Sequence, residues 1–311
     1  MECSQDTDTP LPILSHINAN TLNLANYTLS SGHCKALKRA SQFLQTNINR
    51  VRFNNCGIDD GEMANLLQAF CQFKDFKSII YRQNELNEES LEWLRRLLAK
   101  GIPYHLQELR ISDCRLTPHV TSELIKALAQ KSFLKQFELR NAALSCEDVQ
   151  RLGDYVIHSK QIEELDLSYN GMMPNLVDVL LEKLVSSKRL VSLNLAQNSL
   201  IEGNTGANQK RKLESEARAK NWLTIFIGGS KKLIHLDLTK TSLSEEAILF
   251  ILPTIKSSKN LQGVHLSGNP GVTDAVRERV TALLRVKPPV QRRSVNIVKL
   301  LSPQTQERYK T

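Results

Sequence analysis

The chain has 311 residues, of which 41% are hydrophobic and 23% charged, a balance that is typical of a folded protein in water and excludes a mainly disordered one. Its formal charge of +9 is uneven, because residues 285–311 hold seven basic residues and one acidic residue. The six cysteines stand singly, without the C-x-x-C pair of common zinc sites, which predicts a reducing, intracellular location.

Two further features argue against a membrane or secreted protein. The first residues, MECSQDTDTPLPIL, are acidic where a signal peptide is basic. No stretch approaches the ~18 consecutive apolar residues that a transmembrane helix needs. We therefore expect a cytoplasmic protein with no membrane partner.

From the N-terminus, residues 1–18 show little pattern and predict a cap or extension, and residues 19–284 repeat one template of eleven residues. Its first, fourth and sixth positions are apolar, and its ninth is often Asn or Cys, as in IEELDLSYNGM. Copies of the template begin at Ala19, Ile48, Phe76, Leu106, Leu134, Ile162, Leu190, Leu233 and Leu261. Their spacing is 28 to 30 residues, with one exception of 43.

Each copy predicts a short strand followed by a helix. Positions four and six point to the same side of a strand and are apolar, so they should face the core, whereas positions three, five and seven face the opposite side. Between copies, segments such as TPHVTSELIKALAQKSF place apolar residues three and four apart, as on an amphipathic helix. The ninth residue comes where the chain leaves the strand, where it can satisfy backbone groups of the turn. Units of this kind cannot bury their faces alone and must stack.

With this template and spacing, residues 19–284 resemble a leucine-rich repeat protein of the ribonuclease-inhibitor-like subclass, whose units have about 28 residues. The resemblance implies an α/β solenoid of about nine repeats, curved like a horseshoe, with parallel strands on the concave face and helices on the convex face. Members of the subclass include cytosolic inhibitors, activators of the small GTPase Ran, actin-regulating and ciliary scaffolds, and arms of innate immune receptors. The basic charge departs from the ribonuclease inhibitor, which is acidic, and the basic C-terminal stretch departs from the acidic tail of Ran activators.

The concave face offers the candidate binding residues. Positions three, five and seven are rich in arginine in the first units and acidic in the middle ones, so this face should change sign along its length. Two readings stay open: a solvated face whose charges pair across strands, and a surface that binds a protein partner, for which arginine is well suited. Under the second reading, we expect Arg52→Glu together with Arg82→Glu to weaken a partner and leave the fold intact. The candidate partner-binding residues are Arg50, Arg52, Arg82, Arg110, Glu138, Arg140, Glu164, Asp166, Asp237 and His265.

No motif predicts catalysis or a cofactor. His235, Asp237 and His265 fall on neighbouring strands, but zinc needs a third protein ligand, and an open sheet has no cavity to exclude water. Ser267 beside His265 does not make a catalytic triad, because a flat row of strands holds its side chains parallel. The sequence therefore predicts a protein that is not an enzyme, with no metal, cofactor or small-molecule substrate.

The exceptional spacing lies in SLIEGNTGANQKRKLESEARAKNW, residues 199–222. Counting back from Leu233, Trp222 falls where Phe250 falls in the next unit, so the outer helix is retained and residues 201–215 are added before it. GNTGANQK is not a phosphate-binding loop, because that motif needs four residues between its glycines. We expect the insertion to project from the rim as a loop, which contacts either a partner or only water. The candidate contacts of this rim loop are Lys210, Arg211 and Lys212.

Residues 285–311 form a basic C-terminal tail, in which Arg292, Arg293 and Lys299 are candidates for contact with an acidic protein surface. Nucleic acid is a less favoured partner, because no nucleic-acid-binding module accompanies the tail. The sequence thus predicts a non-enzymatic protein-protein interaction scaffold that belongs to a cytoskeletal or ciliary assembly. The alternative is a regulator of a small GTPase of the Ran type.

Overall fold

The computed structural model describes residues 12–45, 48–99, 106–131, 133–203 and 209–284. The chain forms two compact units, residues 1–165 (unit 1) and residues 166–311 (unit 2). Their division falls within one short strand, and the interrupted stretch 199–222 lies inside unit 2. The expected basic tail, with Arg292, Arg293 and Lys299, and most of the expected N-terminal extension lie outside the described residues.

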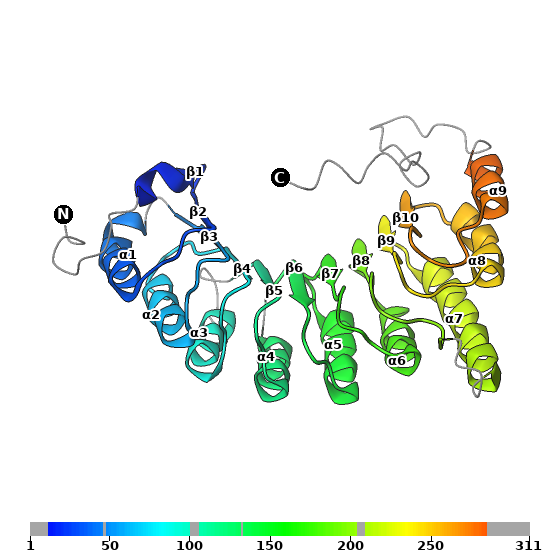
Figure 1. Cartoon of the computed structure of the whole chain (residues 1–311), viewed down its shortest axis with the longest axis horizontal. Coiled ribbons are helices and arrows are strands. Elements are labelled where there is room, and N and C mark those ends of the chain that lie inside the picture. Colours follow the sequence, from blue (N-terminus) through cyan, green and yellow to red (C-terminus); the bar gives the residue numbers. More distant parts are fainter. Residues whose placement is uncertain (1–11, 46–47, 100–105, 132, 204–208, 285–311) are drawn as a thin grey trace. The chain divides into compact units, whose positions relative to one another are not determined.

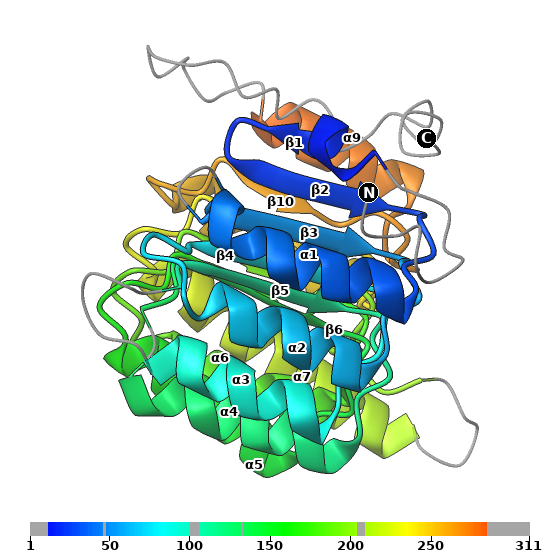
Figure 2. The same cartoon turned by 90° about the vertical axis from the view of Figure 1, so that its left-hand side faces the viewer.

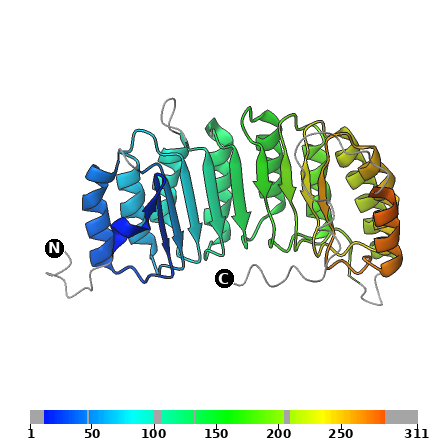
Figure 3. The same ribbon diagram turned by 90° about the horizontal axis from the view of Figure 1, so that it is seen from above.

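Unit 1 alternates strands and helices as the template predicts. After a short 3-10 turn, η2 (Ile13–His16), its elements are β1 (Ile17–Asn18), β2 (Thr21–Ala25), α1 (Ser31–Leu44), β3 (Arg50–Asn54), α2 (Asp60–Phe70), β4 (Ser78–Arg82), α3 (Glu88–Ala99), β5 (Glu108–Ser112), α4 (Pro118–Lys131), β6 (Gln136–Arg140) and α5 (Cys146–His158). Strands β2 to β6 run parallel and in register, side by side in Figure 3, and β1 pairs antiparallel with β2. Figure 2 shows α1 to α5 following one another along one side of these strands.

Unit 2 continues the same alternation (Figure 1). Its elements are the end of β7 (Glu164–Asp166), α6 (Pro174–Leu184), β8 (Ser192–Asn194), α7 (Gln209–Gly229), β9 (His235–Asp237), α8 (Glu245–Ser257), β10 (Gly263–His265) and α9 (Asp274–Leu284). Strands β8, β9 and β10 pair in parallel, and Ser192, His235 and Gly263 occupy the same register position.

The core confirms the assignment of template positions four and six. In β3 these are Val51 and Phe53, and in β9 and the residue after it they are Leu236 and Leu238; all four are fully buried. Each helix buries the apolar side chains on the side that faces the strands, as the amphipathic pattern predicts. Several helices begin at a capping residue: the side chains of Ser30, Asp59, Ser145 and Ser244 each accept the backbone N–H of the third residue beyond.

Position nine satisfies backbone groups of two repeats at once. Asn198 is buried; its Oδ1 accepts the N–H of Met172 at 3.0 Å, and its Nδ2 donates to the carbonyls of Leu167 and Leu195 at 2.9 and 3.0 Å. Where the residue is cysteine, the thiol takes over only the donor half, as Cys114 does toward the carbonyl of Tyr81. Since buried carbonyls need partners, residues such as Asn198 and Cys114 at this position tie their turns to the preceding repeat, which confirms the structural role predicted for them.

Position eight of the template, for which no role was predicted, makes the turn out of the strand. It has a positive φ, between 52° and 73°, in every repeat. The residues are Asn26, Asn55, Gln83, Asp113, Asn141, Tyr169, Gln197, Lys240 and Gly268. Most of them are Asn, Asp or Gly, the residue types that tolerate this conformation, so the signal was present in the sequence.

Strands β7, β8 and β9 have three residues, whereas β2 to β6 have five. At position five these shorter strands carry Asp166, Asn194 and Asp237, and each side-chain oxygen accepts the N–H two residues further on, at 2.9 to 3.0 Å. Such a local bond competes with strand pairing. The side chain at position five therefore takes up the N–H that would extend β7, β8 and β9, whereas β10 has three residues as well and carries His265 at this position.

The prediction that residues 201–215 form a loop is wrong for residues 209–215. Helix α7 begins at Gln209, not after residue 215, and Lys210, Arg211 and Lys212 lie in its first turns. Ser215 is buried and joins the helix to the incoming chain, because its Oγ accepts the N–H of Glu202 at 2.9 Å. The segment 209–215 is rich in Lys, Arg, Leu and Glu, which are good helix formers, so it extends the helix toward its N-terminus.

Candidate functional site

The candidate site is the strand face of unit 1, which we define as the side chains at positions three, five and seven of β2 to β6. These side chains point away from the helices. The register aligns them across strands: Arg52 lies beside Ile80, Ile80 beside Arg110, and Arg110 beside Glu138. Of the ten concave-face residues that the sequence nominated, six are on this face: Arg50, Arg52, Arg82, Arg110, Glu138 and Arg140.

Four strand-face residues and Glu164 form an ion-pair network. Glu138 is 3% exposed, and its carboxylate accepts two hydrogen bonds from Nη2 of Arg82, at 3.0 and 3.1 Å. Arg110 donates from Nε to Glu108 at 2.6 Å and lies 3.5 Å from Glu138 and 3.8 Å from Glu164. Within this network the reading of a face with cross-strand pairs is therefore correct.

The arginines and carboxylates of this network compensate one another's charge. Burial alone would lower the pKa of Arg110, but the carboxylates of Glu108, Glu138 and Glu164 raise it above its ordinary value. Glu108 is further held by the hydroxyl of Ser78, which donates to it at 2.6 Å. Burying a carboxylate such as Glu138 costs free energy unless partners of this kind compensate it.

Arg82 is therefore not free to bind a partner, as the sequence predicted it would be. Its register neighbour on β5 is Ser112, and it reaches past this small side chain to Glu138 on β6. Replacing Arg82 would strip the buried Glu138 of its closest cation. From these contacts we expect Arg82→Glu to destabilise unit 1, which the sequence did not predict.

Arg50 and Arg52 on β3 are in a different position. Both are exposed, and neither makes an ion pair within the part of the chain that the structure describes. The strand-face residues beside Arg50 are Thr21 and Ser78, and those beside Arg52 are Asn23 and Ile80, all of them uncharged. These two arginines form an uncompensated pair of cations, which we call the β3 arginine pair. Arg140 on β6 is half-buried.

The nominated residues of unit 2 are committed to local bonds. Asp166 accepts the backbone N–H and hydroxyl of Ser168 and the side-chain amide of Asn194, at 2.6 to 2.9 Å. Asp237 accepts the N–H of Thr239 at 2.9 Å, while His265 is exposed. The described residues include no group of three His, Cys, Asp or Glu side chains placed to hold a metal ion.

The candidate rim contacts occupy the projecting start of α7. Lys210 is exposed and lies 3.9 Å from Glu214, one helical turn further on, a pairing that stabilises a helix only slightly. Leu213 is exposed as well. The structure therefore presents these cations on a helix and not on a loop.

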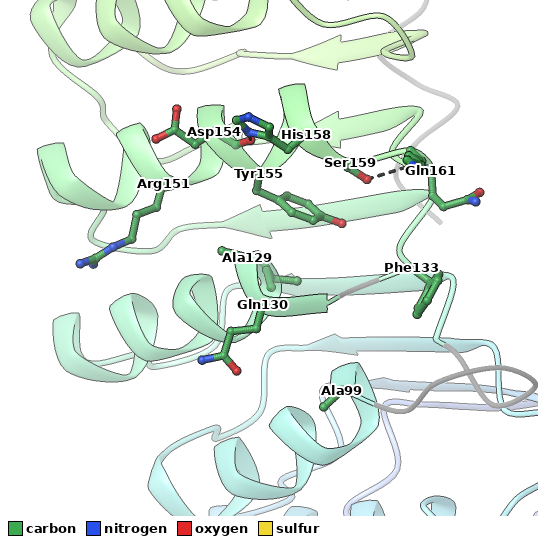
Figure 4. A pocket seen from close by; sticks show the side chains of 12 residues that line it. Ala99, Ala129, Gln130, Phe133, Arg151, Asp154, Tyr155, His158, Ser159 and Gln161 are labelled. Carbon is green, nitrogen blue, oxygen red and sulfur yellow. Dashed lines mark hydrogen bonds between the residues drawn. The ribbon is translucent and has the colours of Figure 1, made fainter.

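A pocket of about 730 Å³ lies on the helix side of unit 1, among the C-terminal ends of α3, α4 and α5 (Figure 4). Its wall includes Leu128, Phe133 and Tyr155. Its polar groups are used locally: Nδ1 of His158 contacts the carbonyl of Asp154 at 2.7 Å, and the hydroxyl of Ser159 accepts the N–H of Gln161 at 3.2 Å. Neither of these two contacts pairs a nucleophile with a base.

The repeat period, the inward apolar positions, the strand–helix alternation and the bridging position-nine residues define the class: the chain is a leucine-rich repeat protein with an α/β solenoid fold. None of the helices in the described ranges combines the length and apolar character needed to cross a bilayer. No family model matches the chain.

Relatives that carry leucine-rich repeats support this class. The chain is 24% identical over 191 residues to human NACHT, LRR and PYD domains-containing protein 14, covering 61% of this chain and 17% of that protein. It is 26% identical over 255 residues to mouse NACHT, LRR and PYD domains-containing protein 9C, covering 81% of this chain and 23% of that protein. The chain thus spans less than a quarter of these relatives.

Among solved structures, the chain resembles the tropomodulin C-terminal domain of Caenorhabditis elegans, with 18% identity and a TM-score of 0.41. The match covers 55% of this chain and 92% of that domain. A likeness at this TM-score says nothing about function or partners.

Proposed function

We propose that this chain is a non-enzymatic protein-interaction scaffold, which binds an acidic segment of a protein partner on the strand face of unit 1, at the β3 arginine pair. Strand surfaces are the usual binding surfaces of solenoid repeat proteins. The observation that carries the proposal is a contrast within the strand face. Arg50 and Arg52 are exposed and make no ion pair with the residues that the structure describes, whereas Arg82 and Arg110 are paired with carboxylates.

Two like charges on alternate residues of one strand lie about 7 Å apart at their Cα atoms. At that separation they repel each other by about 0.6 kcal/mol in bulk water, and more where water is excluded. The same face compensates Arg82 and Arg110 with carboxylates, whereas the β3 arginine pair has no charged partner among the described residues, so this pair is an unfavourable feature of the free protein. A partner carboxylate would remove that repulsion, and arginine would hold it with two parallel hydrogen bonds.

The neighbourhood of the pair suits a polypeptide. Ile80 lies beside Arg52 and is half-buried, which gives the surface an apolar spot next to its charge. Protein interfaces combine such apolar contact with arginine anchors. Membership of a cytoskeletal or ciliary assembly stays a prediction, and no contact among the described residues favours a GTPase regulator.

The test compares three full-length proteins by quantitative affinity purification with crosslinking. Arg50→Gln/Arg52→Gln removes the pair. Lys35→Gln/Lys74→Gln removes the same charge from exposed sites elsewhere in unit 1 and serves as the matched control. We expect a partner that crosslinks near β3 to be lost from the first variant and kept by the second. Arg50→Lys/Arg52→Lys should recover binding only in part, because lysine cannot form the two parallel bonds.

Binding of the purified partner is then measured by calorimetry. Loss of one charge-assisted contact typically costs about 1.5–3 kcal/mol, so we expect at least a tenfold weaker Kd for the double Gln variant. An unchanged Kd, or equal weakening in the Lys35/Lys74 control, would show that the β3 arginine pair is not the binding site.

A further inference from the structure

Unit 2 carries a row of cations at the turns that lead from each helix into the next strand. These turns, α6–β8, α7–β9 and α8–β10, carry Lys188, Arg189, Lys231, Lys232 and Lys259, which we call the basic row. The row is independent of the strand face of unit 1.

The register of the strands places these cations together. Lys188, Lys231 and Lys259 each precede the first residue of β8, β9 or β10 by four positions, and those first residues are aligned with one another. Arg189 and Lys232 form a second aligned position. Since adjacent strands lie about 4.8 Å apart, like charges recur at closely spaced positions from one repeat to the next.

Nothing within the described part of unit 2 compensates this charge. All five side chains are exposed, none makes an ion pair there, and the turns 185–191, 230–234 and 258–262 contain no Asp or Glu. Some other cations of the unit are paired: Arg218 lies 2.8 Å from Asp178, and Lys220 contacts Glu246 at 2.5 Å. The basic row therefore repels itself in the free protein.

Attraction to the helix ends does not account for the whole row. The negative end of a helix dipole favours a cation in the last turn, and Lys183 and Lys256 already occupy the last turns of α6 and α8. The basic row comes after these residues, and two of its turns hold two adjacent cations each.

We propose that the basic row binds the anionic headgroups of a phospholipid surface, which revises the expectation from the sequence that the protein has no membrane partner. The exposed side chains of the three turns are only Ser, Lys, Arg, Asn and Gln, while Leu190, Leu233 and Leu261 are buried. A folded protein partner would need an apolar centre, and single-stranded nucleic acid would need aromatic side chains to stack on its bases. A lipid surface needs neither, because adsorption through lysines is electrostatic.

The composition also favours lipid over duplex nucleic acid. Four of the five cations are lysines, whose long flexible stems carry a hydrated point charge, whereas the bidentate clamp on a backbone phosphate is typical of arginine. The negative ends of α6, α7 and α8 lie at this same edge and oppose close approach of a rigid phosphate backbone. Extended lysines reach headgroups without bringing the helix ends into contact with them.

The test is co-sedimentation of the full chain with vesicles of phosphatidylcholine containing about 30% phosphatidylserine, beside pure phosphatidylcholine vesicles. Lys188→Gln/Arg189→Gln/Lys231→Gln/Lys232→Gln removes four charges of the row. Lys35→Gln/Lys74→Gln/Arg115→Gln/Lys135→Gln removes four exposed charges from unit 1 and is the matched control. Residues 285–311, which are basic, are present in every protein compared.

We expect the wild-type protein to bind only the anionic vesicles, with partitioning at least about tenfold weaker in the basic-row variant and less than about twofold weaker in the control. Lys188→Arg/Lys231→Arg/Lys232→Arg should bind as the wild type does, which distinguishes loss of charge from damage to the fold. Binding should weaken steeply with added salt.

Equal binding by the basic-row variant and the control would overturn the proposal, because other cations would then account for adsorption. The same proteins are also titrated against a 20-base-pair duplex, about two turns of DNA, and against polyglutamate. Basic-row-dependent binding to either of these, without binding to the anionic vesicles, would likewise overturn the lipid assignment.

Discussion

The ion-pair network makes a quantitative prediction about Arg82. Arg82→Ala removes two hydrogen bonds to the carboxylate of Glu138, which is 3% exposed and keeps only Arg110, at 3.5 Å. A hydrogen bond to a charged group contributes about 1.5–3 kcal/mol when it is buried. Because the side chain of Arg82 is itself 37% exposed, we expect the lower part of that range, about 2 kcal/mol of lost stability. Arg52→Ala, on the same face but without an ion pair among the described residues, should not destabilise the protein, because it relieves the repulsion of about 0.6 kcal/mol with Arg50.

The assay can be made specific for unit 1. The chain has two tryptophans, Trp93 in α3 of unit 1 and Trp222 in α7 of unit 2. Urea unfolding followed by fluorescence in a Trp222→Phe background therefore reports on unit 1, where the effect of Arg82→Ala should appear. Repeat proteins do not always unfold in one step, so the two single-tryptophan backgrounds are needed for a defined free energy.

A double-mutant cycle with Glu138→Gln then isolates the pair. We expect a coupling energy of about 1–2 kcal/mol between Arg82 and Glu138, because the two side chains are in direct contact. The reasoning is refuted if Arg82→Ala costs no more than Arg52→Ala, or if the coupling energy is zero. Either result would return Arg82 to the set of residues free to bind a partner.

Three other predictions concern stability and thiol chemistry. Gly271→Ala should strongly destabilise unit 2, because a Cβ there would overlap the backbone of Ser244. The unfolding transition reported by Trp222 fluorescence measures this loss of stability. If the variant is as stable as the wild type, the backbone shifts to make room for the Cβ. Asn198→Ala should cost at least about 2 kcal/mol, because buried backbone groups of two repeats lose their partner, and a cost below about 0.5 kcal/mol would contradict the bridging role. Burial raises the pKa of Cys114 to about 11, so its contribution to stability is full below the unfolded thiol's pKa of about 8.5 and is lost as the pH rises toward about 11. Iodoacetamide at neutral pH should modify exposed Cys146 before Cys114, and equal rates would argue against this burial.

The repeat starts and the inward positions were predictable because burial imposes a fixed period. Position four or six must be apolar wherever one side of a strand is packed, so Val51, Phe53, Leu236 and Leu238 could be assigned from spacing alone. Position nine was likewise readable, since a turn with buried carbonyls requires a donor.

The partners of the strand-face charges were not predictable in the same way. Register arguments pair nearest neighbours, whereas Arg82 passes its own neighbour, Ser112, and reaches the second strand along. That reach depends on the length of arginine and on the small size of serine, a combination that no single-strand pattern reveals. The early start of α7 at Gln209 was missed for another reason: the glycines and asparagines before it suggested a loop, and the helix-forming run after them received too little weight.

The side chain at position five of the template differs between the two units. In unit 1 it carries long side chains such as Arg52 and Arg110, which extend over the strand face and are either paired or left exposed. In unit 2, Asp166 and Asp237 fold back onto their own backbone, ending the strands and using their carboxylates as acceptors.

The carboxylates of Asp166 and Asp237 on the strand face of unit 2 are therefore used locally, and the basic row of that unit lies at its turns. One substitution type separates the two roles: Asp237→Leu should lengthen β9 by freeing the N–H of Thr239, and should leave binding at both Arg52 and the basic row unchanged. Amide hydrogen exchange at Thr239 measures the first effect, and unaltered protection there would mean that the side chain at position five does not set the length of the strand.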